Sequence, residues 1–349
     1  MKLHTQIIGT GLIGTSIALN LAEKGWPLEL LDISDRKRKL ANDLVPDAKK
    51  LDQVELVIVA TPPGASFQAI LEAHEINPQA LVIDVGSVKS KLQHEVEDFP
   101  ELSKRFIGTH PIAGRERSGA ESARSDLFAE RAWIVIPSSD VDEGDVEKVF
   151  TLIKELGAHP YLMTTSAHDN LFAKISHLPQ VISVALASSI SDLGEDLALA
   201  GQGLRDMLRI SASDGELWSE ILLNNQDEIV EAIEDFKDIL ESLTEAIEDN
   251  DSSKIIEIFD DVRNVSKRVS AKHGMKPRDY TYLNVVIEDK PGQLGALFNE
   301  CSEISVNVED LNIEHSPNQA TGLIRLALSE KDSKALEEHL VAKGWKVHR

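Results

Sequence analysis

Cysteine and positive charge are both scarce in this chain, and each scarcity excludes a class of protein. The 349 residues include one cysteine, Cys301, so the chain forms no internal disulfide and suits the reducing cytoplasm. Lys and Arg number 36 against 59 Asp and Glu, which gives a net charge of −23 with histidine neutral. A surface this acidic repels phosphodiester backbones and anionic lipid head groups, so we expect no nucleic-acid or membrane partner.

Long hydrophobic runs are also missing from the sequence. We find no apolar run that approaches the roughly 20 residues of a membrane-spanning helix, and the chain begins with a strand-like segment rather than a signal peptide. The hydrophobic fraction of 42% and the charged fraction of 27% are ordinary for a globular protein, and the length suggests two or three domains. We therefore expect a soluble protein of several domains.

Short apolar runs alternate with amphipathic stretches over the first 165 residues. The strand-like runs lie at 3–8, 28–31, 56–60, 80–85, 107–109, 133–136 and 159–163. Buried strands that alternate with helices indicate an α/β fold with a parallel sheet. We predict a Rossmann-type domain over residues 1–165.

Two further domains follow from a change of pattern. Residues 166–275 are helical, and within 226–248 one apolar seam recurs at steps of three and four: Ile229, Ile233, Phe236, Leu240, Leu243 and Ile247. The seam suits a helix of an intramolecular bundle and a dimerisation helix equally well. A linker at 274–279 precedes 280–349, where strands and helices return in the order βαββαβ, which is the ferredoxin-like motif.

A glycine-rich turn follows the first predicted strand and indicates a nucleotide site. The GxGxxG pattern comprises Gly9, Gly11, Leu12, Ile13 and Gly14. Asp32 follows at the end of the second strand. The glycines let the backbone approach a pyrophosphate, the helix N-terminus favours its charge, and the carboxylate binds ribose hydroxyls. Asp32 would repel a 2′-phosphate, so we expect NAD rather than NADP; the basic run at 36–38 either offsets this repulsion in part or is a solvated helix face.

Further candidates follow the later strands at the same sheet edge, where open α/β sheets bind their ligands. Thr61 and Pro62 follow the third strand and are expected to line the nucleotide. Ser87 follows the fourth strand, where it either contacts nicotinamide or substrate or caps a helix. His110 follows the fifth strand, and an imidazole of near-neutral pKa suits a base that accepts a hydroxyl proton; a loop-capping histidine is the alternative.

The predicted helical domain adds polar candidates. Three of them lie near its start: His168, Asp169 and His177. They lack a third ligand at metal-binding spacing, so we expect helix caps and core hydrogen bonds and no metal site. Arg205 and Arg209 lie four residues apart on one helix face, with Asp206 between them. They suit either an anionic substrate, because guanidinium matches carboxylate, or salt bridges to neighbouring helices.

Taken together, these segments resemble the prephenate and arogenate dehydrogenase family with a C-terminal ACT domain. The resemblance covers essentially the whole chain and rests on GTGLIG, DVGSVK, GTHPIAGRERSG, HDNLFAKISHLPQ and GLRDMLR with a later tryptophan, in this order. It implies a homodimeric enzyme of tyrosine biosynthesis that oxidises prephenate with NAD and releases carbon dioxide to give 4-hydroxyphenylpyruvate. Arogenate is the alternative substrate, and a non-catalytic sensor of NAD and an amino acid is the alternative of another class.

The resemblance also implies roles for single residues. His110 matches the histidine that takes the proton of the ring hydroxyl, and Ser87 matches the serine that orients this hydroxyl and the nicotinamide. Arg209 matches the arginine that holds a substrate carboxylate, with Asp206 supporting its helix. The residues that match positions around the pocket are His177, Trp218 and Glu116. The candidates for the second carboxylate of prephenate are Arg115 and Arg205.

At the C-terminus the resemblance implies regulation. The turn that holds Asp289, Gly292 and Leu294 matches the ACT pattern. Such domains usually pair and bind an amino acid at their interface, so tyrosine or another aromatic amino acid is the expected effector; a ligand-free structural domain is the alternative. In one departure from the pattern, the glycine often found between the first helix and the second strand is replaced within the segment 303–305.

Overall fold

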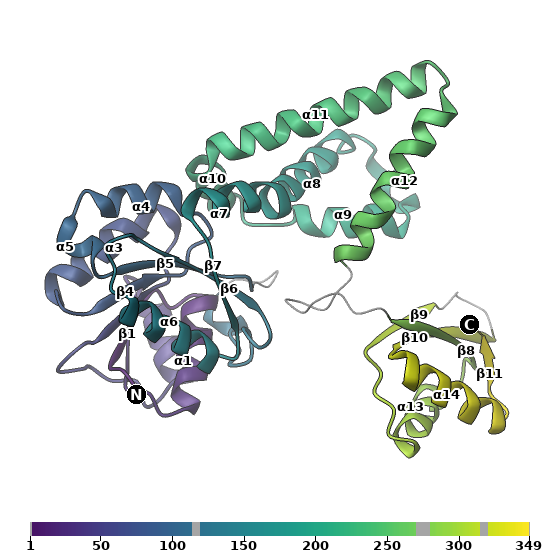
Figure 1. Ribbon diagram of the computed structural model, residues 1–349, viewed down its shortest axis with the longest axis horizontal. Helices are drawn as coiled ribbons and strands as arrows, with labels where there is room; N and C mark the ends of the chain where they lie inside the picture. The colour runs from purple at the N-terminus through teal and green to yellow at the C-terminus, as the bar shows by residue number, and fades with distance from the viewer. Residues whose placement is uncertain (1, 114–118, 270–279, 315–319, 349) are drawn as a thin grey trace. The chain divides into compact units, whose positions relative to one another are not determined.

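The chain forms two compact units, one over Met1–Val265 and the other centred on Lys276–Arg349 (Figure 1). The computed structural model describes residues 2–113, 119–269, 280–314 and 320–348. Both the predicted Rossmann-type domain and most of the predicted helical domain lie in the first unit, and their exact boundary at 165 stays a prediction. The predicted linker at 274–279 lies outside the described residues.

A seven-stranded sheet forms the centre of the first unit, in the order β2-β1-β3-β4-β5-β6-β7. Its strands are β1 (Thr5–Ile8), β2 (Leu28–Leu31), β3 (Leu56–Val59), β4 (Leu81–Asp84), β5 (Phe106–Pro111), β6 (Ala132–Pro137) and β7 (His159–Leu162). The first five are parallel, as predicted, but β6 pairs antiparallel with β5, and β7 runs parallel to β6. A parallel neighbour needs a long crossover, usually a helix, whereas the described part of the β5–β6 connection holds only a short 3-10 turn, Ala120–Ser122.

Helices cover both faces of this sheet. They are α1 (Leu12–Glu23), α2 (Asp35–Leu44), α3 (Pro63–Ile76), α4 (Ser90–Glu97), α5 (Pro100–Ser103) and α6 (Glu143–Glu155). Consecutive residues of β3 alternate between two cores: Ile58 packs with residues of α1 and α6, whereas Val57 and Val59 pack with residues of α3 and α4. The central strand β3 therefore reads as a continuous apolar run, as expected for a strand buried on both faces.

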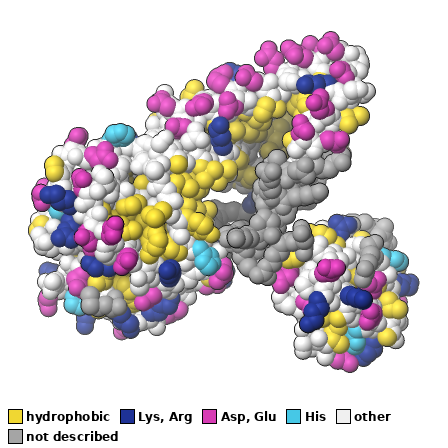
Figure 2. Space-filling model, viewed as in Figure 1, with side chains coloured by type: hydrophobic (Ala, Val, Ile, Leu, Met, Phe, Trp, Pro, Cys, Tyr) yellow, Lys and Arg dark blue, Asp and Glu magenta, His cyan; other side chains and the backbone are white. Residues whose placement is uncertain are grey.

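The rest of the first unit is helical. Its elements are α7 (Thr165–Phe172), a π-helical turn η2 (Ala173–His177), α8 (Leu178–Ser189), a 3-10 turn η3 (Gly194–Leu199), α9 (Gln202–Ser211), α10 (Gly215–Asn224), α11 (Gln226–Glu248) and α12 (Ser252–Val269). The apolar seam of α11 divides in two. Ile229 is buried against side chains of η2, α8 and α10, whereas Leu240 and Ile247 are 46% and 63% exposed. Figure 2 shows acidic side chains along α11 and α12.

One expectation about hydrophobic runs is wrong. The helical stretch Thr165–Ser189 is long and apolar enough, by length and composition alone, to cross a membrane. It also contains His168, Asp169 and His177, which are all at most 1% exposed within the protein. Ionisable side chains are costly in a bilayer, and these three are buried within the protein, so the stretch contributes polar groups to the interior although only 28% of its apolar window is buried.

The second unit confirms the predicted βαββαβ order. Its elements are β8 (Thr281–Glu288), α13 (Gln293–Glu303), β9 (Asp310–Glu314), β10 (Thr321–Leu328), α14 (Glu330–Ala342) and β11 (Lys346–His348). The strands form an antiparallel sheet in the ferredoxin-like order β11-β8-β10-β9. Ser305, in the segment where the usual glycine is replaced, has a φ of +55°, so the turn keeps the left-handed conformation that glycine favours.

Candidate functional site

The glycine-rich turn between β1 and α1 is shaped by close backbone packing. A Cβ atom added to Gly9 would lie 2.4 Å from the carbonyl oxygen of Ala60, and one added to Gly14 would lie 2.0 Å from that of Gly9. Gly11, at the N-cap of α1, differs because no atom of the described residues lies within 4 Å of an added Cβ. The turn therefore leaves open space before the helix N-terminus, where the amides that follow it, including those of Leu12 and Ile13, suit a phosphate.

The Asp32 carboxylate, at the end of β2, is held in place by three hydrogen bonds. It accepts hydrogen bonds from Thr10 N at 2.8 Å, Thr10 Oγ1 at 2.9 Å and Ser34 N at 2.8 Å. Burial alone would raise the pKa of Asp32, but these hydrogen bonds outweigh it and lower the pKa. Beside the ionised carboxylate, the side chain of Ile33 is fully exposed. A carboxylate for ribose hydroxyls and an apolar surface for adenine together fit NAD.

The neighbouring candidates support this assignment of the sheet edge. Thr61 N would lie 3.1 Å from a Cβ at Gly9, so Thr61 and Pro62 adjoin the glycine-rich turn. Within the basic run, Arg38 forms an exposed ion pair with Asp35 on the surface of α2 at 2.6 Å. This contact favours the solvated-face interpretation for that arginine.

His110, in β5, is half-buried and begins a chain of buried and partly buried hydrogen bonds that ends at the N-terminus of α4. Its Nδ1 lies 2.8 Å from His168 Nε2, and His168 Nδ1 lies 2.7 Å from Asp169 Oδ1. The Asp169 carboxylate also accepts the backbone N–H groups of Lys89, at 3.1 Å, and Ser90, at 2.7 Å. His168 and Asp169 are fully buried, so the chain joins β5, α7 and α4 in the interior.

His177 approaches the same cluster from the π-helical turn. Asn225 Nδ2 donates to the carbonyl oxygen of Asp169 at 3.0 Å and lies 3.2 Å from His177 Nδ1. Because the carbonyl oxygen of Asp169 only accepts, the Asn225 atom that faces it is the amide nitrogen, which donates. His177 Nδ1 therefore accepts from Asn225, and the proton of the neutral His177 ring lies on its Nε2. Burial lowers the pKa of His177 to about 4, and the indole of Trp218 meets its ring edge-on, with 6.1 Å between centroids.

A buried ion pair holds the loop that carries Ser87. The Asp84 carboxylate accepts from Lys89 Nζ at 2.5 Å, Gly86 N at 2.8 Å and Thr109 N at 3.1 Å. Ser87 is half-buried and lies three residues before α4 begins, whereas Asp169 binds the first amides of that helix. The interpretation of Ser87 as the N-cap of this helix is therefore wrong. That Ser87 contacts nicotinamide or substrate stays a prediction.

The charged candidates on α9 and in the β5–β6 connection are placed differently. Arg209 and Asp206 are exposed on α9, a helix without a buried residue, and Gln202 Nε2 donates to Asp206 at 2.8 Å. Ser183 Oγ donates to Met207 O at 2.7 Å and so ties α9 to α8. Arg205 is exposed on the same helix. Glu116 and Arg115 lie outside the described residues.

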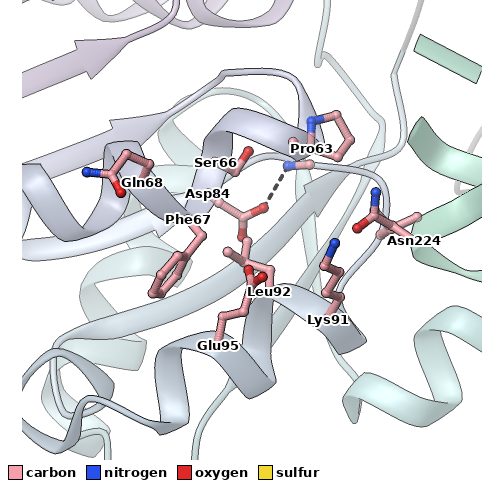
Figure 3. Close-up of a pocket in the computed structure, with 12 residues that line it drawn as sticks. Pro63, Ser66, Phe67, Gln68, Asp84, Lys91, Leu92, Glu95 and Asn224 are labelled. Carbon is pink, nitrogen blue, oxygen red and sulfur yellow. Dashed lines mark hydrogen bonds between the residues drawn. The ribbon is translucent and has the colours of Figure 1, made fainter. Parts of the chain in front are cut away.

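A pocket of about 140 Å³ opens beside the site rather than over His110 (Figure 3). It lies among α3, α4 and α10 and is lined in part by Phe67, Lys91 and Asn224. Its lining also includes Gly86 and Val88, which flank Ser87, and Pro63, which follows Pro62. The pocket therefore adjoins the loops that carry Ser87 and Pro62 but does not include His110 in its lining.

The sequence analysis did not predict that His168 and Asp169 are linked to His110. His168 and Asp169 do form core hydrogen bonds, as expected, but their link to His110 spans 58 residues of sequence and was not foreseen. Asn225 carried no signal at all, whereas Lys89 and Asp84 lie within the quoted DVGSVK motif. Three-dimensional proximity alone identifies this group.

The effector candidates lie in the second unit, at the turn between β8 and α13. Asp289 N donates to Ala320 O at 2.9 Å, and Gly292 has a φ of +90°. Leu294 packs against the core of this unit. The predicted turn thus forms, and its conformation requires the glycine.

Comparisons with known proteins match this arrangement. Residues 17–162 match the family model of the prephenate dehydrogenase nucleotide-binding domain, and residues 164–261 match that of the dimerization domain. The chain is 27% identical to the prephenate dehydrogenase of Bacillus subtilis, over 99% of this chain and 97% of that relative.

Two solved structures resemble this chain over about three quarters of its length. One is prephenate dehydrogenase from Aquifex aeolicus in complex with hydroxyphenyl propionate and NAD+, with a TM-score of 0.71, 28% identity and coverage of 76% of this chain and 97% of that one. The other is arogenate dehydrogenase from Synechocystis, with a TM-score of 0.66, 25% identity and coverage of 76% and 99%.

Proposed function

The chain belongs to the prephenate dehydrogenase family, and from this premise we propose that it oxidises prephenate with NAD and releases carbon dioxide to give 4-hydroxyphenylpyruvate. The observation that carries the proposal is the position of His110. It lies in β5 at the carboxyl edge of the sheet that also holds the glycine-rich turn and Asp32. A neutral imidazole beside a dinucleotide site suits oxidation of a hydroxyl-bearing carbon.

The proposed chemistry divides into a proton transfer and a bond cleavage. His110 accepts the proton of the ring hydroxyl as a hydride leaves the same carbon. NAD, when bound, supplies the hydride acceptor. The electrons of the bond to the ring carboxylate then enter the ring, carbon dioxide leaves, and the ring becomes an aromatic phenolate whose oxygen takes up one proton from solvent to give the phenol. Ser87 orients the hydroxyl, and Arg209 holds a substrate carboxylate through its guanidinium.

Substrate preference is the open part of this proposal. We propose prephenate first because the matched family models and the Bacillus relative carry that name. The similarity to an arogenate dehydrogenase makes arogenate the second candidate. Steady-state assays of NADH formation with each substrate compare kcat/KM directly, and a higher value for arogenate would reverse the assignment.

The pH dependence of turnover follows from the surroundings of His110. Burial and then the neighbouring His168, Lys89 and His177 lower its pKa well below 6.5, because each disfavours a positive charge on the ring. His110 therefore remains an unprotonated base as the pH falls through 6.5. We expect the acid limb of the kcat/KM profile to lie well below 6.5, and a limb at or above 6.5 would contradict this prediction.

A dimer formed through the helical region is the second part of the proposal. The matching model is a dimerization domain, and many large apolar side chains of this region are exposed: Val184, Leu193, Leu199, Leu217, Leu223, Val230, Ile239, Leu240, Ile247, Ile256, Phe259 and Val262. Burial of these side chains against a second copy would remove them from water. We propose that this homodimer acts in the cytoplasm, which suits its single reduced cysteine.

Regulation by an aromatic amino acid is the third part of the proposal. The ferredoxin-like topology of the second unit and the turn at Asp289, Gly292 and Leu294 support an ACT domain. We expect tyrosine to bind the full-length protein and to lower its rate of NADH formation. Calorimetry and rate assays test this prediction. The absence of both binding heat and inhibition at millimolar tyrosine would contradict it.

A further inference from the structure

The hydrogen-bond chain from Asp169 through His168 to His110 determines where each proton lies. This inference deepens the proposed function and rests on it, because it concerns the base of the same reaction. The chain contains one carboxylate and two imidazoles, and its only links are 2.7 Å and 2.8 Å long. Each link needs one donor and one acceptor, so fixing the first fixes the second.

The first link is fixed by the carboxylate. Burial would raise the pKa of Asp169, but hydrogen bonds from His168 and Ser90 outweigh this effect and lower it. Its oxygens also accept two backbone amides at the N-terminus of α4, where the helix dipole favours negative charge. An ionised carboxylate only accepts, so His168 Nδ1 carries a proton.

The second link follows because His168 is neutral. Its ring is fully buried, and burial followed by the nearby Lys89 ammonium lowers its pKa below the usual value despite the pull of Asp169. A neutral imidazole with a proton on Nδ1 has a lone pair on Nε2. His110 Nδ1 must therefore donate to His168 Nε2, which leaves the lone pair of His110 on its own Nε2.

We propose that Asp169 and His168 are positioning residues that hold His110 in the tautomer with Nε2 unprotonated, the form that accepts the substrate proton. The proton balance is simple. The substrate O–H bond breaks, its proton joins His110 Nε2, and His110 becomes a cation that still donates from Nδ1 to His168. The ionised Asp169 stabilises this charge through His168, and the proton later leaves His110 for solvent.

The direct test is Asp169→Asn. An amide with its oxygen toward His168 would leave the proton on His168 Nδ1 but would lose the negative charge that stabilises protonated His110. With its oxygen on Ser90 N instead, its NH2 group would take the place of Oδ1, face Lys89 N and His168 Nδ1, and make His168 Nδ1 an acceptor. His168 Nε2 would then donate to His110, and the proton of His110 would move to Nε2 and mask the base. We expect kcat to fall about 10²-fold or more, with KM and the Kd for NAD changed less than about threefold. Asp169→Asn with wild-type kcat would overturn the proposal.

The matched control is Asp145→Asn. Asp145 is another buried carboxylate of the first unit, and it pairs with Arg105 and Lys148 away from the site. Its substitution tests whether loss of any buried carboxylate lowers kcat. We expect near wild-type kcat, and a loss equal to that of Asp169→Asn would overturn the proposal.

Variants of His168 leave Asp169 and its contacts with α4 in place, so they remain informative if Asp169→Asn folds poorly. The side-chain carbonyl of His168→Gln can accept from His110 Nδ1, whereas His168→Phe cannot. We expect His168→Gln to exceed His168→Phe in kcat by about tenfold or more. We also expect His168→Gln to restore part of the activity lost in Asp169→Asn, whereas a purely structural role predicts that the two losses add.

Nitrogen NMR of histidine-labelled protein reads the tautomer without turnover. In the wild type, Nδ1 of His110 should carry the proton and Nε2 should not, and Asp169→Asn should exchange the two. The opposite wild-type assignment would overturn this proposal even if prephenate is oxidised. A wild-type protein that shows the expected tautomer but oxidises no prephenate would instead contradict the proposed function.

Discussion

Replacement of His110 by asparagine should remove nearly all turnover and leave NAD binding intact. Asparagine keeps a polar side chain in β5 but cannot accept a proton at neutral pH, so the ring hydroxyl would lose its base. Loss of general-base catalysis typically costs about 10²- to 10⁴-fold in rate. Asp32 and the glycine-rich turn lie at β2 and β1, away from the substitution, so the Kd for NAD should change little.

The assay is NADH formation under saturating prephenate, with NAD affinity measured by calorimetry. His159→Asn is the matched control, because His159 is an exposed histidine of the same sheet that pairs with Glu130 at 2.9 Å. It should keep wild-type kcat. If His110→Asn kept more than about a third of the kcat, the base would have to be another group.

Gly14→Ala should destabilise the first unit and weaken NAD binding with it. The new Cβ would lie 2.0 Å from the carbonyl oxygen of Gly9, a backbone atom that cannot turn aside as a flexible side chain can. Relief requires α1 to move off β1 and β3, and overpacking of this kind costs about 3 kcal/mol or more in a rigid contact. We expect a lower Tm and at least a tenfold weaker Kd for NAD.

Gly11→Ala separates folding from binding at the same turn. Within the part of the chain that the structure describes, no atom lies within 4 Å of the added Cβ, and the φ of −75° suits alanine, so stability should change by less than about 1 kcal/mol. The methyl group would nevertheless occupy the space where a pyrophosphate approaches the backbone. We expect a normal Tm with weaker NAD binding; an unchanged Kd would place the nucleotide elsewhere, and a stable Gly14→Ala would refute the packing argument.

The fold was largely predictable because local patterns encode it. Apolar runs such as 56–60 mark strands buried on both faces, and the observed β3 covers 56–59. The reversed direction of β6 and β7 was not predictable, because strand direction depends on the path of the connection rather than on the strands themselves. In the same way, hydropathy alone does not distinguish the apolar stretch at 165–189 from a membrane-spanning helix. The buried polar side chains that the structure shows within it make the distinction.

The candidate site was predictable in part. The strand-end rule located His110, Ser87 and Asp32 because it depends on local sequence alone. The hydrogen bonds from His110 to His168 and from Ser90 to Asp169 join residues 58 and 79 positions apart, so no spacing in the sequence signals them. The π-helical turn that carries His177 is likewise a departure from regular helical spacing, common at functional sites and invisible in a 3.6-residue pattern.

The most direct test measures the products of one reaction mixture. Purified full-length protein with NAD and prephenate should form NADH and carbon dioxide in equal amounts, together with 4-hydroxyphenylpyruvate, and His110→Asn should form all three at least about 10²-fold more slowly. NAD binding without NADH formation from prephenate or arogenate would contradict the proposed function. NADH formation without carbon dioxide would contradict the proposed coupling of hydride loss to decarboxylation.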